Sequence, residues 1–359
     1  MIEILTGDCR ETLKELEDKS IQCCVTSPPY WGLRDYGTAT WVGGDPNCSH
    51  KRDSKHSESC STGQKNLKGA IGDGIYKKVC KRCGAVRVDS QLGLELTPEE
   101  YVDNMVQVFR EVHRAMKDDG TLWLNLGDTY SAQRWTKKGE TKTEAQPMNG
   151  MKDGHRSIAP TKESGLPDKN LVGIPWKVAF ALQADGWYLR QDIIWSKPNP
   201  MPESVKDRCT KSHEYIFLMT KSPKYYYDNE AIKEKATGER WGGNTPIDMD
   251  NTKDTDNQFS GLTRKRKMLY EMKNKRSVWT ITTKPYSEAH FATFPEDLIL
   301  PCILAGTKKG DKVLDPFGGS GTTGRVAIEN ARRAVLCELN PEYIELINKR
   351  TTTTIGLGI

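Results

Sequence analysis

The stretch Thr26-Ser27-Pro28-Pro29-Tyr30-Trp31 holds residue types that could bind a flat ligand with a polar edge. It follows an apolar run over 21–25 that predicts a buried strand, and two consecutive prolines end a strand because they supply no N–H to the ladder. The Ser27 hydroxyl and the Pro28 carbonyl can accept hydrogen bonds, and Tyr30 and Trp31 are expected to form an exposed aromatic pair that stacks on a ring. The turn therefore suits a nucleobase, with a plain Pro-Pro strand ending as the alternative.

A glycine-rich turn late in the chain follows one predicted strand and precedes a predicted helix. It contains a G-x-G-x-x-G pattern from Gly319 to Gly324, and such glycines let a backbone approach a ligand closely. Glu338 ends the next predicted strand, where an acidic side chain can accept hydrogen bonds from both hydroxyls of a ribose. These features indicate nucleoside binding, with a purely structural strand-to-helix turn as the alternative.

The residues beside this turn favour a cationic ligand over a dinucleotide. Asp315 and Phe317 put an acid and an aromatic ring just before the glycines. A carboxylate suits the positively charged amino-acid end of S-adenosylmethionine better than it suits a pyrophosphate. The turn also lies near the end of the chain, so the other strands must come from the N-terminal half. The sequence therefore predicts S-adenosylmethionine as cofactor and a sheet built in permuted order.

Four soft metal-ligand candidates occur in two close pairs, Cys48 with His50 and Cys80 with Cys83. This pattern suits tetrahedral zinc. The segment between the pairs has few apolar residues, so a metal would supply the stability that a core cannot. We expect a structural zinc, with loose surface thiols as the alternative and with His56 and Cys60 as substitute ligands.

The composition limits the class of protein. In 359 residues, 53 Lys+Arg against 48 Asp+Glu give a net charge of +5, so a surface for nucleic acid must be local. No apolar run approaches the length of a membrane span, and the N-terminus lacks a signal pattern, which favours the cytoplasm. Disulfides are rare there, so Cys23 and Cys24, inside a predicted strand, are expected to be buried thiols.

The elements that position these residues alternate between strands and helices. Strands are expected at 2–5, 21–25, 121–126, 188–195, 214–219, 312–314 and 334–337. Helices are expected at 9–16, from the Thr97 cap to a stop at 118–120, at 175–184, at 295–305, after the glycine-rich turn, and at 341–350. This alternation predicts an α/β sheet.

An early Ser-Pro-Pro-Tyr (27–30) and a late Asp-Pro-Phe-Gly-Gly-Ser-Gly-Thr-Thr (315–323) resemble, in this order, the DNA amino-methyltransferases of the β arrangement. The resemblance covers nearly the whole chain. It implies a seven-stranded, mostly parallel, Rossmann-like α/β methyltransferase sheet in circularly permuted order. The implied parts are a catalytic half at 1–220 with an insert at 44–90 and a mobile loop at 131–169, a target-recognition region at 221–285, a cofactor-binding half at 286–350 and a tail at 351–359.

The resemblance also implies site residues. The target base, taken out of the duplex, would be held by Ser27, Pro28, Pro29 and Tyr30. S-adenosylmethionine would be bound by Asp8, Phe294, Pro295, Asp315, Phe317, Gly319, Gly321, Thr322 and Glu338. DNA phosphates would be held by Arg264, Lys265, Arg266, Lys267, Lys275 and Arg276, with a solvated charged loop as the alternative.

These residue types supply a mechanism for methylating an exocyclic amino group, whose lone pair is delocalised into the ring. Ser27 Oγ and the Pro28 carbonyl can accept its two hydrogens and pull the nitrogen toward tetrahedral geometry, and no covalent cysteine is required. In the family that the chain resembles, serine before Pro-Pro-Tyr is commoner in the cytosine branch and aspartate in the adenine branch. The resemblance therefore implies cytosine N4, with adenine N6 and a DNA-binding regulator without turnover as alternatives. Double-stranded DNA is the expected partner. A cognate restriction endonuclease and a homodimer are left open, as is a bacterial or a phage origin.

Overall fold

The computed structural model describes residues 1–32, 38–50, 79–131, 164–236, 240–241, 267–268, 272–283 and 294–355. An eight-stranded sheet forms its centre, in the order β1-β14-β13-β2-β5-β7-β6-β12. The strands are β1 (Ile2–Thr6), β14 (Arg333–Glu338), β13 (Lys312–Asp315), β2 (Ile21–Thr26), β5 (Met116–Leu126), β7 (His213–Thr220), β6 (Tyr188–Ser196) and β12 (Val278–Thr280). Only β7 of these eight strands runs antiparallel to its neighbours.

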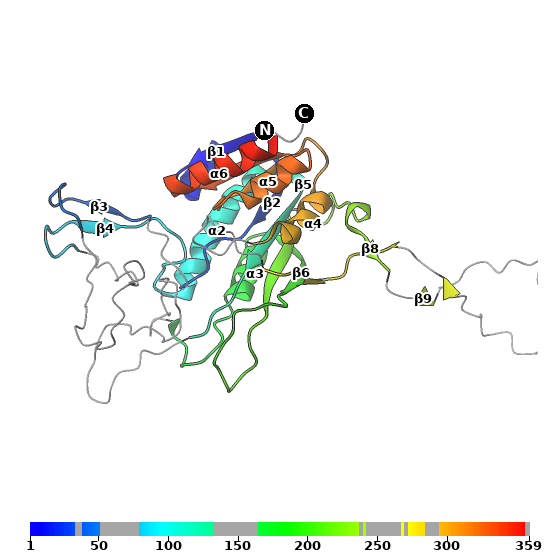
Figure 1. Ribbon diagram of the computed structural model, residues 1–359, viewed down its shortest axis with the longest axis horizontal. Helices are drawn as coiled ribbons and strands as arrows, with labels where there is room; N and C mark the ends of the chain where they lie inside the picture. Colours follow the sequence, from blue (N-terminus) through cyan, green and yellow to red (C-terminus); the bar gives the residue numbers. More distant parts are fainter. Residues whose placement is uncertain are drawn as a thin grey trace, which may run out of the picture.

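The predicted permuted, mostly parallel sheet is thus confirmed, and the predicted count of seven strands is one too low. The extra strand, β12, comes from the segment expected to form the target-recognition region, and it pairs in parallel with β6. Within β12 only Trp279 is buried, so a single apolar side chain gave little periodicity from which to predict a strand. The first strand and the last helix lie together at the opposite edge, where β1 pairs with β14 and contacts α6 (Pro341–Ile355) (Figure 1).

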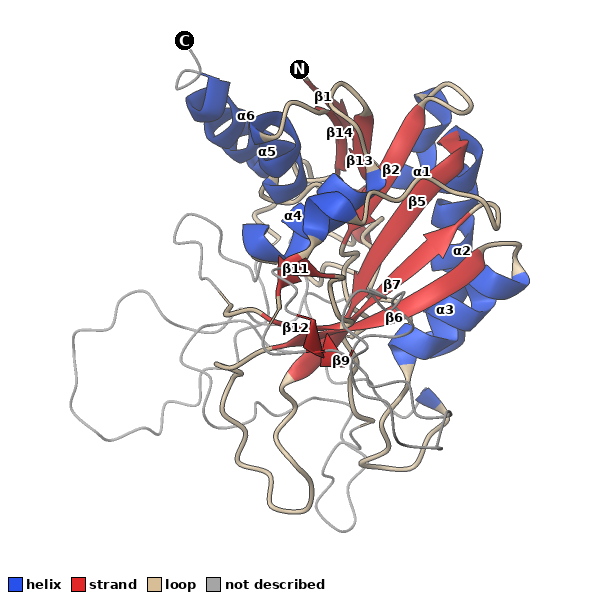
Figure 2. Ribbon diagram, turned by 90° about the vertical axis from the view of Figure 1, so that its right-hand side faces the viewer, coloured by secondary structure: helices blue, strands red, loops and turns tan. Residues whose placement is uncertain are grey.

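Helices cover both faces of the sheet (Figure 2). One face packs against α1 (Cys9–Thr12), the short helix η1 (Leu13–Glu15), α2 (Pro98–Ala115) and α3 (Ile174–Ala184). The other face packs against α4 (Glu296–Gly306) and α5 (Thr322–Glu329), and α6 lies beside α5. This is the layer order that βα alternation predicts.

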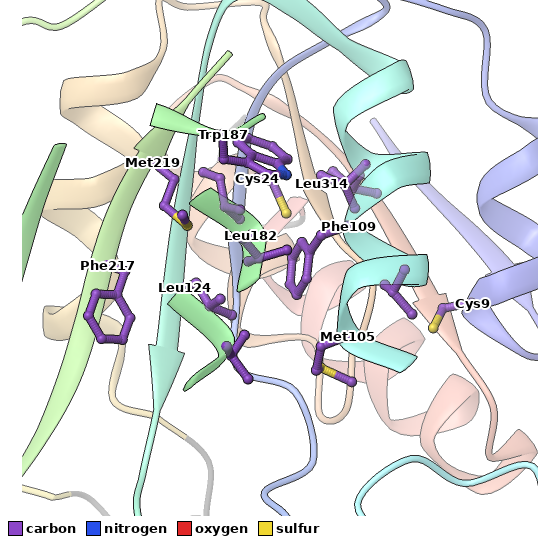
Figure 3. Close-up of a cluster of buried hydrophobic side chains, with 14 of the residues drawn as sticks. Cys9, Cys24, Met105, Phe109, Leu124, Leu182, Trp187, Phe217, Met219 and Leu314 are labelled. Carbon is purple, nitrogen blue, oxygen red and sulfur yellow. The ribbon is translucent and has the colours of Figure 1, made fainter. Parts of the chain in front are cut away.

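The two cores are separated by the alternation of side chains along the strands. Cys24 lies in the cluster with Phe109, Leu124 and Leu182, which Figure 3 shows, whereas Cys23 lies in the cluster on the other face. Both thiols are fully buried, which confirms their prediction as core residues. Burial raises the pKa of Cys23 to about 12, so this thiol stays protonated and unreactive.

Two predicted boundaries are wrong. Helix α2 ends at Ala115 and β5 begins at Met116, five residues before the predicted strand and before the predicted stop at 118–120. Met116 has an extended backbone and pairs with Ile21, so it belongs to the strand. The prediction placed it in the helix because its position continues the helical spacing of apolar residues. Helix α6 runs to Ile355, so 351–355 is helical and not a tail, and Thr351 is buried.

Short hairpins and loops complete the described chain. They comprise β3 (Thr40–Val42) with β4 (Val86–Val88), β8 (Glu234–Lys235) with β11 (Met272–Lys273), β9 (Arg240–Trp241) with β10 (Lys267–Met268), and the short helix η3 (Glu230–Ile232). The β3–β4 hairpin projects away from the sheet (Figure 1). Most of the loop predicted at 131–169 lies outside the described residues, but its ends are paired, because Tyr130 forms a bridge with Leu171. Among the described helices, none is long and apolar enough to cross a membrane.

Candidate active site

The carboxyl ends of the neighbouring strands β2 and β13 bring the two predicted motifs together. Thr26, just before the Ser-Pro-Pro-Tyr turn, donates a 2.6 Å hydrogen bond to Asp315. Thr323 on α5 donates to the other oxygen of Asp315 at 2.7 Å, and its Oγ1 lies 3.3 Å from the Val25 carbonyl oxygen. Ligands of open α/β sheets bind at this edge, where strand order reverses. The structure thus joins segments 289 positions apart in sequence into one site.

The Asp315 side chain faces into the protein. It is 1% exposed, and a third hydrogen bond, from the Phe317 N–H at 3.0 Å, completes its contacts. Burial raises the pKa of this carboxyl to about 7. Asp315 therefore fixes the entry to the glycine-rich turn and ties it to β2 and α5. Its predicted direct contact with the cationic end of a cofactor stays a prediction.

The glycine-rich turn is held by hydrogen bonds to Glu338 at the end of β14. Gly319 donates its N–H to Glu338 Oε2 at 2.7 Å, and the Asn340 N–H donates to Oε1 at 2.8 Å. Burial raises the pKa of Glu338. Gly319 has φ +51°, and a side chain there would meet only the Phe317 carbonyl, at 3.8 Å. Of the two glycines predicted to bind the cofactor, Gly319 is the one with free space beside its Cα atom.

Gly321 and Thr322 face the protein instead. A side chain at Gly321 would lie 3.1 Å from Ile347 of α6, so this glycine allows α5 and α6 to approach each other. The buried Thr322 hydroxyl accepts a 3.1 Å hydrogen bond from Arg350, which also donates to the Ser320 carbonyl at 3.0 Å. Arg350, at the end of the predicted last helix, was not singled out from the sequence.

The structure also describes the surroundings of Asp8, Phe294 and Pro295, which are predicted to bind the cofactor. Asp8 caps α1 by accepting the Arg10 N–H at 2.9 Å and the Arg10 side chain at 3.0 Å. Burial works to raise the pKa of Asp8, but these contacts with Arg10 hold it below its ordinary value. Pro295 is buried and precedes α4, where its carbonyl accepts the Leu298 N–H, and Phe294 packs against the core. Residues 284–293, which precede Phe294, lie outside the described chain.

The Ser-Pro-Pro-Tyr turn carries a chain of hydrogen bonds. Ser27 Oγ donates to Tyr30 Oη at 3.4 Å. Tyr30 Oη lies 2.8 Å from Glu214 Oε2 and 3.0 Å from Asn125 Oδ1, and burial together with the Glu214 charge raises the pKa of Tyr30 well above its ordinary value. The Pro29 carbonyl accepts from Tyr101, which fixes the turn to α2.

The predicted exposed aromatic pair is wrong for Trp31. Its side chain is 2% exposed and donates its indole N–H to the Glu95 carbonyl at 3.0 Å. Tyr30 is partly buried, and its ring lies against Gly127, where a Cβ would come within 2.5 Å of the ring. The segment before α2 covers Trp31, which leaves Tyr30 as the aromatic residue of the turn that reaches the site edge.

Glu214, Asn125 and Lys197 are site residues that the sequence analysis did not identify. Glu214 forms an ion pair with Lys197, whose Nζ lies 4.1 Å from the centre of the Trp195 ring. Because β7 is antiparallel, its start lies at the same edge as the ends of β2 and β5. The sequence signal that could have identified Glu214 is its position as an acidic residue near the start of the otherwise apolar strand β7.

The predicted metal ligands come together at the outer end of the β3–β4 hairpin, after β3 and before β4 (Figure 1). The ligand atoms of Cys48, His50, Cys80 and Cys83 all lie within 4.8 Å of one another. Cys48 Sγ lies 3.8 Å from Cys80 Sγ, and Cys83 Sγ lies 3.6 Å from His50 Nδ1. The tight turn that holds Cys80 and Cys83 is closed by the Gly84 N–H, which donates to the Cys80 carbonyl at 2.9 Å. His56 and Cys60 lie outside the described residues.

The predicted DNA-binding cluster is described only in part. Residues 264–266, with Arg264, Lys265 and Arg266, lie outside the described chain, and Lys267 lies in β10. Lys275 Nζ lies 4.9 Å from the centre of the Trp279 ring. Arg276 is exposed but already forms an ion pair with Glu234 at 2.7 Å.

Comparison with known proteins places this chain in a family. The model of the DNA methylase family of N6 and N4 methyltransferases matches residues 21–349. The chain is 40% identical to the type II methyltransferase M.Cfr9I of Citrobacter freundii over 348 residues, which are 97% of this chain and 86% of that protein. It is also 40% identical to M.SmaI of Serratia marcescens over 350 residues, 97% of this chain and 90% of that protein.

Solved structures show the same fold at lower identity. The PvuII DNA methyltransferase, which is cytosine-N4-specific, has a TM-score of 0.53 at 17% identity, over 99% of this chain and 90% of that one. TTHA0409 of Thermus thermophilus, a putative DNA modification methylase complexed with S-adenosyl-L-methionine, has a TM-score of 0.52 at 20% identity, over 100% of this chain and 96% of that one. With the family model matching nearly its whole length, the chain belongs to the N6/N4 DNA methylase family.

Proposed function

We propose that this protein transfers the methyl group of S-adenosylmethionine to the exocyclic N4 of a cytosine in duplex DNA, at a specific sequence. The proposal rests on one observation. The Ser-Pro-Pro-Tyr turn and the glycine-rich turn lie side by side, joined by the 2.6 Å hydrogen bond from Thr26 to Asp315. Transfer requires the amino nitrogen and the methyl donor to lie side by side. Serine in the first position of the catalytic turn favours cytosine, and adenine N6 is the second candidate.

The cofactor would bind along the ends of β13, β14 and β1. Glu338 would hold the ribose, Asp8 would approach the adenine, and the open side of Gly319 would face the methionine part. The buried Asp315 would fix the turn beneath that part, together with Phe317, while Phe294 and Pro295 line the pocket. The cofactor supplies an activated methyl group on a positively charged sulfur.

The catalytic turn would prepare the nucleophile. Ser27 Oγ and the Pro28 carbonyl accept the two amino hydrogens, so the nitrogen lone pair turns toward the methyl group. Tyr30 offers the remaining face of its ring to the flipped base. DNA phosphates would be bound by the basic residues of the recognition region, among which Arg276 must exchange its contact with Glu234.

We also propose that Cys48, His50, Cys80 and Cys83 bind a structural zinc ion. In a tetrahedral site with Zn–S bonds of about 2.3 Å and a Zn–N bond of about 2.0 Å, sulfur atoms lie about 3.8 Å apart, and sulfur and nitrogen lie about 3.5 Å apart. The separations of 3.8 Å and 3.6 Å in this cluster match those values. The cluster lies on the projecting hairpin, which fits a structural role.

The activity is tested by incubating the purified protein with labelled S-adenosylmethionine and unmodified DNA, followed by mass spectrometry of the nucleosides. We expect N4-methylcytosine. N6-methyladenine alone would overturn the choice of base, 5-methylcytosine would also overturn the mechanism, and absence of any methylated base would overturn the enzyme. Sequencing the same DNA with a modification-sensitive method gives the recognition site.

The role of Ser27 is tested by Ser27→Ala. Loss of one acceptor that tightens at the transition state should cost roughly 2.7–4 kcal/mol, or about a hundred- to thousandfold in turnover. Affinity for the cofactor should stay nearly unchanged, because the contact forms only with the base. A rate equal to that of the unaltered protein would remove Ser27 from the mechanism.

A further inference from the structure

The catalytic turn is connected to a buried ion pair that the reaction above does not use. Glu214 at the start of β7 and Lys197 just after β6 are each about one-sixth exposed, and they contact each other directly. The second oxygen of Glu214 lies 2.8 Å from Tyr30 Oη. An ion pair at this depth is costly to bury, so its place beside the turn calls for a role in the site.

The hydrogen-bond chain has one direction. A phenol has one proton, and Tyr30 Oη lies within reach of two acceptors, Glu214 and Asn125. The Asn125 amide N–H donates to the Tyr215 carbonyl at 3.0 Å, which turns its Oδ1 toward Tyr30. Because the proton of Tyr30 is committed to these acceptors, the oxygen can only accept from Ser27.

This direction determines what Ser27 can do for a base. A hydroxyl has one proton and two lone pairs. When the Ser27 proton points to Tyr30, at 3.4 Å, both lone pairs are left for the incoming amino group. Without Tyr30 and Glu214, the Ser27 hydroxyl could rotate and present its proton to the base, which would repel an amino hydrogen.

We propose that Glu214 is a positioning residue that acts through Tyr30 to hold Ser27 as a hydrogen-bond acceptor and that receives the proton the base loses. This inference rests on the proposed function. In the reaction, a bond forms between the amino nitrogen and the methyl carbon, the carbon–sulfur bond breaks, and its electron pair stays on sulfur. The methylated nitrogen carries a positive charge and loses a proton to Ser27 Oγ.

The rest of the transfer follows the chain. Ser27 passes its own proton to Tyr30, and Tyr30 passes its proton to the Glu214 carboxylate, which becomes neutral and later releases the proton to water. Lys197 holds the carboxylate in place, with its ammonium over the Trp195 ring at 4.1 Å. The negative charge at the end of the chain also opposes the positive charge that develops on the base nitrogen.

Two substitutions break the chain at different links. Tyr30→Phe removes one oxygen and keeps the ring that stacks on the base, and Glu214→Gln keeps the shape and removes the charge. For each, we expect the single-turnover rate of methyl transfer to fall about a hundredfold, as is typical for loss of a positioned acid–base group. Cofactor affinity should stay within about twofold, because neither side chain belongs to the cofactor turn.

The matched controls are Tyr188→Phe, which removes the hydroxyl of a 45% exposed tyrosine at the start of β6, and Glu111→Gln, which breaks an ion pair with Arg114 on α2. Both should transfer methyl at the rate of the unaltered protein. The double variant Tyr30→Phe/Glu214→Gln supplies a readout that a merely structural role would not move. Residues that act as one chain are not additive, so its rate should lie within about twofold of the slower single variant.

The outcomes separate this inference from the proposed function. If the unaltered protein methylates DNA but both single variants keep its rate, or if their effects multiply in the double variant, Glu214 does not act through Tyr30 and the inference is wrong. If only Glu214→Gln loses its fold, as judged by thermal unfolding, Tyr30→Phe alone decides. If the unaltered protein methylates no base, the proposed function itself is wrong.

Discussion

The central sheet and the β3–β4 hairpin differ in what holds them together. The sheet buries Phe109, Trp123 and Leu124 almost completely between its helix layers. The hairpin exposes Val42 at 59% and both Val86 and Val88 at 47%. Burial of apolar surface gives about 25 cal/mol per Å², so the sheet has this source of stability and the hairpin has little of it. The proposed zinc would give the hairpin a source of stability that differs from the apolar core of the sheet.

We therefore expect the hairpin to depend on zinc bound by its cluster of soft ligands. The ligand pairs lie at its outer end, between β3 and β4, and the His50 ring stacks on Trp41 with ring centres 4.5 Å apart. From β4 the chain continues directly to Gly93, whose carbonyl accepts the N–H of Gly32 at 2.8 Å, next to the Ser-Pro-Pro-Tyr turn. The hairpin thus lies close in sequence to a segment that supports the active site.

Removal of the metal gives the largest expected effect. Zinc binding to such sites supplies about 10–16 kcal/mol in peptides, so a chelator should abolish the order of 40–50 and 79–88. Hydrogen exchange should show loss of protection there, with protection of β2 and β5 retained. Cys83→Ser should remove the zinc, measured as one ion per chain by elemental analysis, while the exposed Cys209→Ser should retain it. Absence of zinc from protein purified without chelator would break the comparison.

Asp315 shows that burial in the sheet also has a cost. Its folded-state pKa, about 7, lies above the ordinary 3.8, so the folded state binds more protons between these values. The stability contribution is therefore complete below about pH 4 and is lost as pH rises to about 7, by roughly 4 kcal/mol at most. In Asp315→Asn this loss should vanish. Urea unfolding at pH 5 and pH 8 should show that the free energy of unfolding of the variant, relative to that of the unaltered protein, is higher at pH 8 than at pH 5. The same relative free energy at both pH values would contradict the raised pKa of Asp315.

Much of the fold could be predicted because apolar runs and glycine turns are local signals. The runs before Thr26 and Asp315 predicted β2 and β13, and the late glycines predicted the start of α5. Contacts that depend on strand neighbours were harder. The Glu214 carboxylate reaches Tyr30 only because β7 is antiparallel, and the strand direction was not part of the prediction. Trp31 was expected on the surface because nothing in the turn itself shows that 93–97 covers it.

A core substitution should strongly affect the sheet and leave the hairpin unchanged. Leu124→Ala removes a fully buried side chain between α2 and α3, and such changes cost about 2–5 kcal/mol. The urea midpoint should fall while the zinc content stays at one per chain. Loss of zinc from this variant would mean that the hairpin needs the sheet core, contrary to the comparison.

The smallest effect belongs to the matched substitution in the hairpin, Val86→Ala. Val86 is 47% exposed and pairs with Val42, so its truncation should change stability by less than about 0.5 kcal/mol, the usual range for surface changes. Alanine keeps the backbone pairing of β3 with β4, and the four ligands are untouched. If the hairpin is held by its metal, its hydrogen-exchange protection should be the same in this variant and in the unaltered protein. A loss of protection as large as that caused by the chelator would show that side-chain packing, and not the metal, holds the hairpin.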